Sequence, residues 1–341
     1  MAATSTLSNT STTITTTTAT PSCITVTPGP NGYVPATACN AEWNYSPSLA
    51  ASVLFTTLFC LTASTHIYQA IIYKKKKLSW VIVMGALWEF ASFVLRSLGS
   101  KNQQNATYAF VSTLLVFLGP LWINAFDYMV LGRMIHFFIT EKEIWGFKAT
   151  KIAKTFVWLD ILSFLTQATG VLILQPGVSA SQMQLGIHIY MGGIGFQELS
   201  ILIFTSLVMR FLIVKRAEDR LNLSSFKRCG NEGNWRRLVW ALYTSLALIT
   251  VRIVFRMIEY SKGTNPSTNP VPFHEAYFYC FDAVPMLMAC VIMNCMHPGR
   301  VLVGEGSEFP KGPTRKEKKA IKAAKKAEKR ATKEAKKQVI G

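Results

Sequence analysis

Residues 252–259 read RIVFRMIE and close an otherwise apolar run that begins at Leu238. The three charged residues of this stretch are Arg252, Arg256 and Glu259, and their helical spacing places them on one face. A charge at the centre of a membrane-spanning helix costs roughly 2.5–3.5 kcal/mol. Such a helix needs partners or a water-filled cavity for its charges inside the membrane. We therefore expect the functional site to lie where these charges meet their partners.

Apolar blocks of this kind recur along the chain. Half of the 341 residues are hydrophobic and only 16% are charged, whereas soluble domains carry roughly 25% charged residues. Seven blocks are long enough to cross a hydrocarbon core, which takes about 20 residues. They are Leu49–Tyr73, Leu78–Leu98, Tyr108–Phe138, Ile152–Leu174, Leu185–Val214, Leu238–Ile258 and His274–Met296. The sequence therefore predicts an all-α membrane protein, a bundle of seven transmembrane helices. We expect this protein in the plasma membrane, with an internal membrane of the cell as the alternative.

The basic residues predict how these spans are oriented. The loops after the first, third and fifth spans contain clusters that begin at Lys74, Lys142 and Lys215, whereas the alternate loops carry only Lys101 and Lys262. Lys and Arg are retained on the cytoplasmic side of a membrane. We therefore expect the N-terminus outside and the C-terminus in the cytoplasm.

The predicted spans divide the chain into three regions. Residues 1–44 are a Thr/Ser-rich segment that we expect to be extracellular and disordered, residues 45–299 hold the spans, and residues 300–341 are a Lys/Ala-rich cytoplasmic tail. The tail is either attracted to anionic inner-leaflet lipids, by about 1 kcal/mol per basic residue, or is a solvated segment. Because the tail is tethered beneath a membrane, binding to nucleic acid is not expected.

Candidate modification sites lie in the segments predicted to face outside. Asn9, Asn44 and Asn105 each begin an Asn-x-Ser/Thr triplet, the acceptor for N-glycosylation. A chance match is the alternative for each, because the triplet is common. Cys23 and Cys39 could form a disulfide, since exported segments meet an oxidising environment.

Polar residues recur inside the predicted spans at helical spacing. Eleven of them define the candidate polar cleft: Glu89, Arg96, Asp160, Gln167, Gln197, Glu198, Arg252, Arg256, Glu259, Glu275 and Asp282. Counting about 1.5 Å per residue from the ends of the spans puts Glu89, Gln167 and Glu198 near the midplane of the membrane. The other charged residues of spans two, six and seven fall in its outer half. Glu275 and Asp282 are expected on one face of span seven. The set is either a closed structural salt-bridge network or a cleft that admits an amphipathic headgroup.

Motifs for catalysis are absent from the sequence. There is no Gly-rich phosphate loop followed by Lys-Ser or Lys-Thr, and no Gly-x-Ser-x-Gly nucleophile motif. None of the five histidines has a second His or Cys at metal-ligand spacing. We therefore expect a protein that is not an enzyme, with no catalytic residue, metal or cofactor.

A series of spaced motifs carries a resemblance to a known family. The motifs are Tyr45-Ser46-Pro47-Ser48, His66, Glu89 with Arg96, Gly119-Pro120, Gly132-Arg133, Asp160 with Gln167, Gly195-Phe196-Gln197, Arg252-x-x-Phe255-Arg256-x-x-Glu259, Glu275 with Asp282, and His297-Pro298-Gly299. In this order they resemble the fungal RTA-like family, also called lipid-translocating exporters, from about Tyr45 to Gly299. Two residues depart from that pattern: Gly119 replaces a small Ala, and Asp127 replaces a small or apolar residue.

The resemblance implies export or flopping of sphingoid long-chain bases, porphyrin or haem traffic, or resistance to lipid-active toxins. We therefore expect a protein that moves amphipathic, lipid-like molecules, with membrane lipids or amphipathic small molecules as its partners. Protein partners are not indicated by the sequence. The alternative is a seven-helix receptor-like sensor or regulator of lipid homeostasis. A Gα-coupled receptor would carry an Asp/Glu-Arg-Tyr-like element where Gly132-Arg133-Met134 stands, which disfavours a receptor.

Overall fold

The computed structural model describes residues 24–173, 179–221, 234–261, 263, 268–304, 306–309 and 324. Within these residues, seven helices are long and apolar enough to cross a membrane. They are α1 (Leu49–Ile72), α2 (Lys76–Lys101), α3 (Ala106–Phe138), α4 (Ala149–Ile173), α5 (Ala180–Arg220), α6 (Asn234–Ser261) and a seventh span made of α7 (Glu275–Phe278), the π-helix η3 (Tyr279–Ala283) and α8 (Val284–Cys295). The predicted seven-helix bundle is confirmed. The side of the membrane that each end faces stays a prediction.

Short elements connect or flank these helices. They are the 3-10 helices η1 (Pro30–Gly32), η2 (Val271–Phe273) and η4 (Pro298–Arg300), and the antiparallel strands β1 (Glu143–Ile144) and β2 (Phe147–Lys148). The two strands form a small hairpin between α3 and α4. Trp145 lies at its turn with a positive φ of 50°, and its side chain is 60% exposed.

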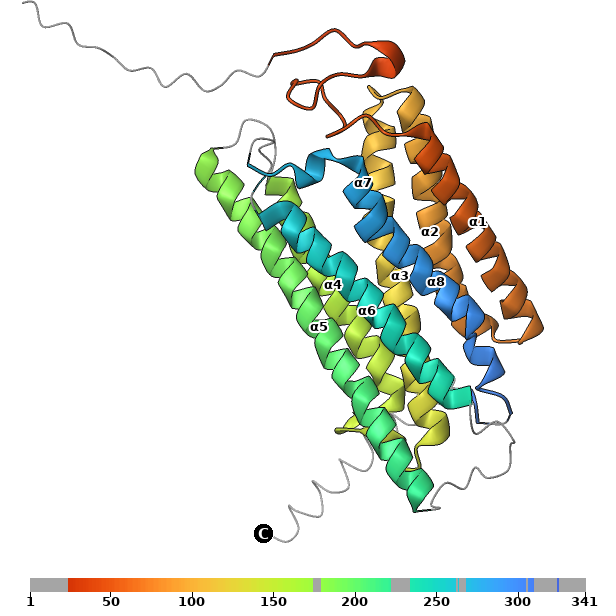
Figure 1. The fold of residues 1–341 in the computed structure, drawn as a ribbon. Coiled ribbons are helices and arrows are strands. Elements are labelled where there is room, and N and C mark those ends of the chain that lie inside the picture. The colour runs from red at the N-terminus through yellow and green to blue at the C-terminus, as the bar shows by residue number, and fades with distance from the viewer. Residues whose placement is uncertain are drawn as a thin grey trace, which may run out of the picture.

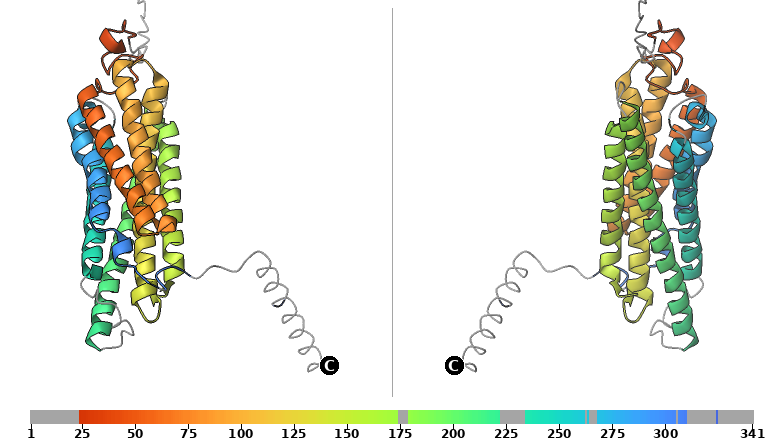
Figure 2. Two further views of the ribbon diagram at one scale, coloured as in Figure 1. Left: turned by 90° about the vertical axis from the view of Figure 1, so that its right-hand side faces the viewer. Right: turned by 90° about the vertical axis from the view of Figure 1, so that its left-hand side faces the viewer.

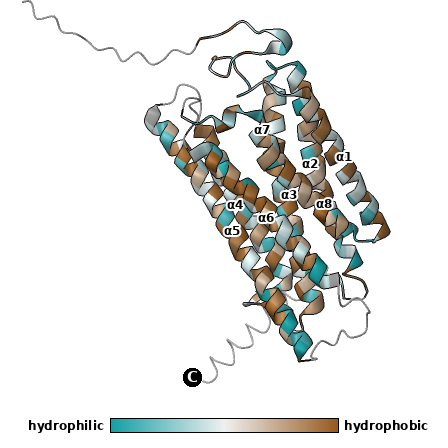
Figure 3. Cartoon of the chain, in the orientation of Figure 1, coloured by the Kyte–Doolittle hydropathy of each residue, from teal (hydrophilic) through white to brown (hydrophobic). Residues whose placement is uncertain are grey.

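The helices run side by side along one direction, and the N-terminal residues lie over one end of the bundle (Figures 1 and 2). In the bundle, α2 packs against α1 and α3, α4 packs against α3 and α5, and α6 packs against α5 and α8. Figure 3 shows apolar residues along the middle of the helices and polar residues at the lower end of α5. Large apolar side chains such as Leu61, Trp158 and Leu202 are exposed, which suits contact with lipid tails.

Side-chain caps begin three of the helices where the sequence changes from polar to apolar. Ser48 Oγ at α1 and Asn105 Oδ1 at α3 each accept a hydrogen bond from a backbone N–H three residues later, at 3.3 and 3.2 Å. Ser179 forms a reciprocal capping box with Gln182 at the start of α5. These caps satisfy backbone donors that a helix start otherwise leaves free.

The candidate modification residues are described in part. Asn44 is exposed, Asn105 caps α3, and Cys39 lies in the segment before α1. Asn9, Cys23 and nearly all of the basic tail lie outside the described residues. N-glycosylation at the three asparagines and the Cys23–Cys39 disulfide therefore stay predictions.

Glycine allows the close approach of α4 and α5. A Cβ added at Gly170 would lie 2.6 Å from the backbone nitrogen of Tyr190 and 2.8 Å from the carbonyl oxygen of Gly186. A Cβ added at Gly192 would meet nothing within 4 Å. Gly170 is therefore required by helix packing, as small residues are at many membrane helix contacts, whereas Gly192 is not.

Gly170→Ala should destabilise the bundle, because the added methyl group forces α4 and α5 apart. We expect a loss of about 1–3 kcal/mol, typical of overpacking, measured as a lower thermal unfolding temperature of the purified protein in detergent. Gly192→Ala is the matched control and should be neutral or stabilising by up to about 1 kcal/mol, since Ala has the higher helix propensity. Equal unfolding temperatures for the two variants would contradict this account of the contact.

Candidate functional site

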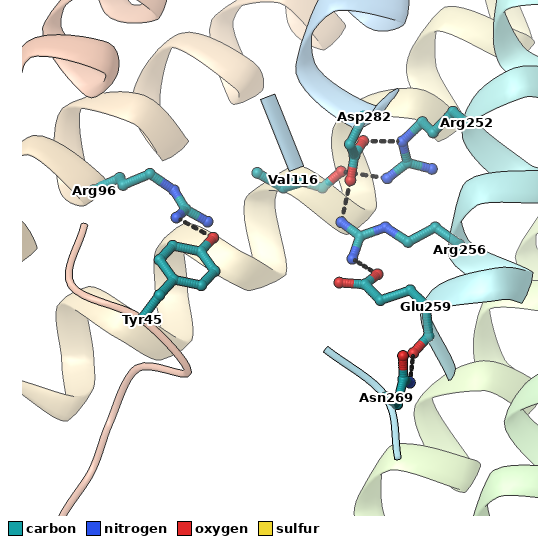
Figure 4. Close-up of polar contacts among 8 residues, drawn as sticks. All are labelled: Tyr45, Arg96, Val116, Arg252, Arg256, Glu259, Asn269 and Asp282. Atoms are coloured by element: carbon teal, nitrogen blue, oxygen red, sulfur yellow. Dashed lines mark hydrogen bonds and ion pairs between the residues drawn. The ribbon is translucent and has the colours of Figure 1, made fainter. Parts of the chain in front are cut away.

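Asp282 lies between two arginines of α6 (Figure 4). Its Oδ1 accepts a hydrogen bond from Arg252 Nε, and its Oδ2 accepts one from Arg256 Nη2. Arg256 also donates through Nη1 to Glu259 Oε2 at 2.7 Å. All four side chains are buried, and Asp282 is only 1% exposed. The two positive and two negative charges therefore balance inside the bundle, and we call these four residues the Asp282 cluster.

A π-helix sets the position of Asp282. The N–H of Val284 bonds to the carbonyl oxygen of Tyr279, five residues earlier, and Pro285 has no N–H to donate. The wider turn changes the register of the seventh span. The sequence predicts Glu275 and Asp282 on one face of a regular helix, but the π-helix lies between them and the two residues contact different partners. Both carboxylate oxygens of Glu275 instead accept from the backbone N–H of Ser48, at 3.0 Å each.

A backbone carbonyl of α3 completes the surroundings of Arg252. Arg252 Nη2 donates to the carbonyl oxygen of Val116 at 3.1 Å (Figure 4). In a regular α-helix this oxygen would accept from the N–H of residue 120, but that residue is Pro120 and carries no N–H. The proline thus leaves an acceptor free for the arginine. Reasoning from side chains alone missed this contact, and the position of Pro120 is the signal that could have indicated it.

Arg96 lies in a separate site at the end of the bundle covered by the N-terminal residues. Its guanidinium is 4.1 Å from the ring centroid of Phe278, 5.2 Å from that of Trp43 and 5.8 Å from that of Tyr45. Its Nη1 donates to the Tyr45 hydroxyl at 2.8 Å. Burial raises the pKa of Tyr45, although the positive charge of Arg96 opposes this shift, so the hydroxyl is neutral at physiological pH. Aromatic rings lie closest to this arginine, and Glu275 interacts with it electrostatically.

Glu89 is a buried acid that no arginine contacts directly. It is 1% exposed, and its Oε1 has no hydrogen-bond partner among the described residues. Glu89 interacts electrostatically with Asp282, Arg252 and Arg256 across the interior. Gly119 makes room for the carboxyl group, because a Cβ added there would lie 2.5 Å from Oε1.

Asp127 is a second acid of this kind. It is fully buried, and its Oδ2 accepts from the hydroxyl of Ser245 at 2.6 Å. Its Oδ1 has no partner within the described part of the chain. Asp127 was noted in the sequence as a departure from the family pattern, but it was not included in the candidate polar cleft.

The remaining cleft candidates make their own contacts between neighbouring helices. Asp160 Oδ2 accepts from Asn124 Nδ2 at 3.2 Å and from the Tyr128 hydroxyl at 3.0 Å. Gln167 Nε2 donates to Gln197 Oε1 at 3.0 Å. Glu198 is hydrogen-bonded to Thr250. The eleven candidates thus occupy several contact groups, of which the Asp282 cluster is the one that joins four of them. That they line one continuous cleft stays a prediction.

Metal ligation finds no support in the described residues, where no group of three or more His, Cys, Asp or Glu side chains could hold a metal ion. The acids instead contact arginines, hydroxyls, amides and backbone N–H groups. The arrangement is suited to holding fixed charges in an apolar medium.

A family model described as RTA1 like protein matches residues 82–305. The chain belongs to the RTA1-like family. One similar protein is the "Probable lipid transporter atnI" of Emericella nidulans, which is 44% identical over 310 residues covering 90% of this chain and 80% of that protein. No solved structure matches the chain.

Two more distant RTA1-like relatives come from Saccharomyces cerevisiae. "Protoporphyrin uptake protein 1" is 24% identical and covers 74% of this chain and 90% of its own length. "Sphingoid long-chain base transporter RSB1" is 21% identical and covers 78% of this chain and 76% of its own length. The resemblance inferred from the sequence is confirmed, and the RTA1-like match includes Glu89, Arg96 and the whole Asp282 cluster.

Asp282→Asn should strongly destabilise this RTA1-like protein, because the variant leaves Arg252 and Arg256 buried with too little negative charge. Removing one partner of a buried ion pair costs about 3–5 kcal/mol. The measurement is the thermal unfolding temperature in detergent, together with the yield of folded protein. Asp219→Asn is the control, since Asp219 is one-third exposed and solvent screens its i,i+4 pair with Lys215, which should contribute about 0.3–0.5 kcal/mol. A similar decrease in unfolding temperature in both variants would contradict a larger contribution of the Asp282 pairs to stability.

Proposed function

We propose that this protein exports or translocates an amphipathic, lipid-like molecule, such as a sphingoid long-chain base, across the plasma membrane and is not an enzyme. Three of its relatives are named for the transport or uptake of a lipid, a sphingoid long-chain base and protoporphyrin. All three cargoes combine a large apolar part with charged or polar groups. A membrane bundle with buried charges provides matching surroundings for both parts.

Glu89 is the single observation that carries the proposal. A carboxylate buried without a direct partner is unfavourable by several kcal/mol, so a cationic group that reaches it is stabilised. The amine of a long-chain base supplies such a cation. The Oε1 atom of Glu89 has no partner among the described residues and is the expected acceptor.

The Asp282 cluster has a different role in this proposal. Asp282 already pairs with Arg252 and Arg256, so it has little charge left to offer a cargo. The cluster instead fixes positive groups close to Glu89, where they limit how deeply a cationic headgroup binds. The apolar chain of the cargo remains in contact with lipid, and the basic tail is proposed to be attracted to anionic inner-leaflet lipids.

Flux of a labelled long-chain base into proteoliposomes that contain only this protein tests the proposal. We expect transport above that of empty vesicles. Glu89→Gln keeps the shape of the side chain and removes its charge. It should slow transport by about tenfold or more, which corresponds to the loss of one charge-assisted hydrogen bond.

Glu141→Gln is the matched control, because it makes the same chemical change at an exposed residue after α3. It should transport as the unmodified protein does. Flux no faster than in empty vesicles would contradict transport by this protein alone. Normal flux in Glu89→Gln would contradict the role of this carboxylate while leaving transport in place.

A further inference from the structure

A groove opens on the outer surface of the bundle between α5 and α6, next to the β1–β2 hairpin. Its volume is about 440 Å³. Its walls include Trp145, Ser206, Met209, Arg210, Ile213 and Tyr243. Four of these residues, at positions 206, 209, 210 and 213, come from α5. Their spacing places them on one face of that helix. None of the wall residues belongs to the candidate polar cleft.

Two polar groups of this groove have no partner in the described part of the chain. Arg210 forms no ion pair or hydrogen bond with a described residue, and the Tyr243 hydroxyl is buried without a hydrogen-bond partner. The hydroxyl of Ser206, by contrast, already donates to the backbone carbonyl of Leu202 at 2.9 Å. A cation and a hydroxyl donor therefore line the same groove with their hydrogen-bonding capacity unused. That combination favours an anionic ligand.

The groove lies close to the end of the predicted apolar span of α5. The predicted apolar span of α5 ends at Val214, four residues after Arg210, which is about 6 Å along a helix. Trp145 and Trp240 are 60% and 67% exposed, and the ring of Trp240 contacts that of Tyr243. Exposed tryptophan and tyrosine are enriched at the membrane–water interface. The basic residues that begin at Lys215 predict that this interface is the cytoplasmic one.

We propose that this groove binds the phosphate headgroup of an anionic phospholipid of the inner leaflet. Arg210 pairs with the phosphate, and the Tyr243 hydroxyl donates to one of its oxygens. The acyl chains lie along Met209 and Ile213, whose side chains are 49% and 50% exposed. A planar guanidinium suits a phosphate because two of its N–H groups can bind two oxygens at once.

The charge of the groove separates this site from the proposed path of the cargo. An unpaired arginine repels the cationic amine of a long-chain base, whereas Glu89 attracts it. Arg210 lines the outer surface of the bundle, while Glu89 is buried inside it. The lipid site is therefore independent of the proposed transport, and the failure of one would leave the other standing.

Native mass spectrometry of the purified full-length protein tests the site. The protein is titrated with dioleoyl phosphatidylglycerol and, separately, with dioleoyl phosphatidylcholine, which has the same chains and no net charge. We expect tighter binding of the anionic lipid. Arg210→Gln should weaken that binding by about fivefold, the factor for one basic contact at a membrane surface, and should reduce the preference for phosphatidylglycerol over phosphatidylcholine, whose choline cation offsets its phosphate.

Arg237→Gln is the matched control, since it removes an exposed arginine at the same end of α6 but outside the groove. It should bind phosphatidylglycerol as the unmodified protein does, and Arg210→Lys should restore part of the affinity. If Arg210→Gln does not fold, Tyr243→Phe removes only the hydroxyl and should also weaken binding. Equal affinity for the two lipids, or equal losses in Arg210→Gln and Arg237→Gln, would overturn the proposal.

Discussion

A charge inside this bundle must find its partner inside the bundle, because the surrounding lipid offers none. Asp282 meets this constraint by accepting from both Arg252 and Arg256, which joins the seventh span to α6. Arg252 reaches further to a backbone carbonyl of α3, and Arg256 reaches to Glu259 of its own helix. Three helices are thus held in register by one carboxylate and the two cations beside it. The same carboxylate and the same two cations interact electrostatically with Glu89 across the interior.

The sequence was sufficient to predict the spans and the presence of buried charge, because hydropathy and helical spacing are local properties. The pairing of those charges was not predictable in the same way. Counting along a regular helix assigned Glu275 and Asp282 to one face, whereas the π-helix η3 gives them unrelated partners. The aromatic surroundings of Arg96 also could not be derived, because Trp43 and Tyr45 come from outside the spans.

The two departures from the family pattern both concern buried acids. Gly119 leaves space that the carboxyl of Glu89 occupies, and Asp127 adds a carboxylate that a serine, not an arginine, contacts. These acids differ from Asp282, whose charge is neutralised by its neighbours. The interior therefore contains the Asp282 cluster, whose charges pair with one another, and two acids, Glu89 and Asp127, that each keep one oxygen without a hydrogen-bond partner among the described residues. The proposed transport rests on Glu89.

Pro120 has a consequence for how this chain can change over evolutionary time. Any other residue at this position would bring back an N–H for the carbonyl of Val116, whose two lone pairs could accept from both that N–H and Arg252. Replacing Arg252 while the proline remains would instead leave that carbonyl without a hydrogen-bond donor in an apolar interior. Losing the arginine while the proline remains is therefore the costlier order of change. The arginine, far from the proline in the sequence, is thus expected to persist in any variant that keeps the proline.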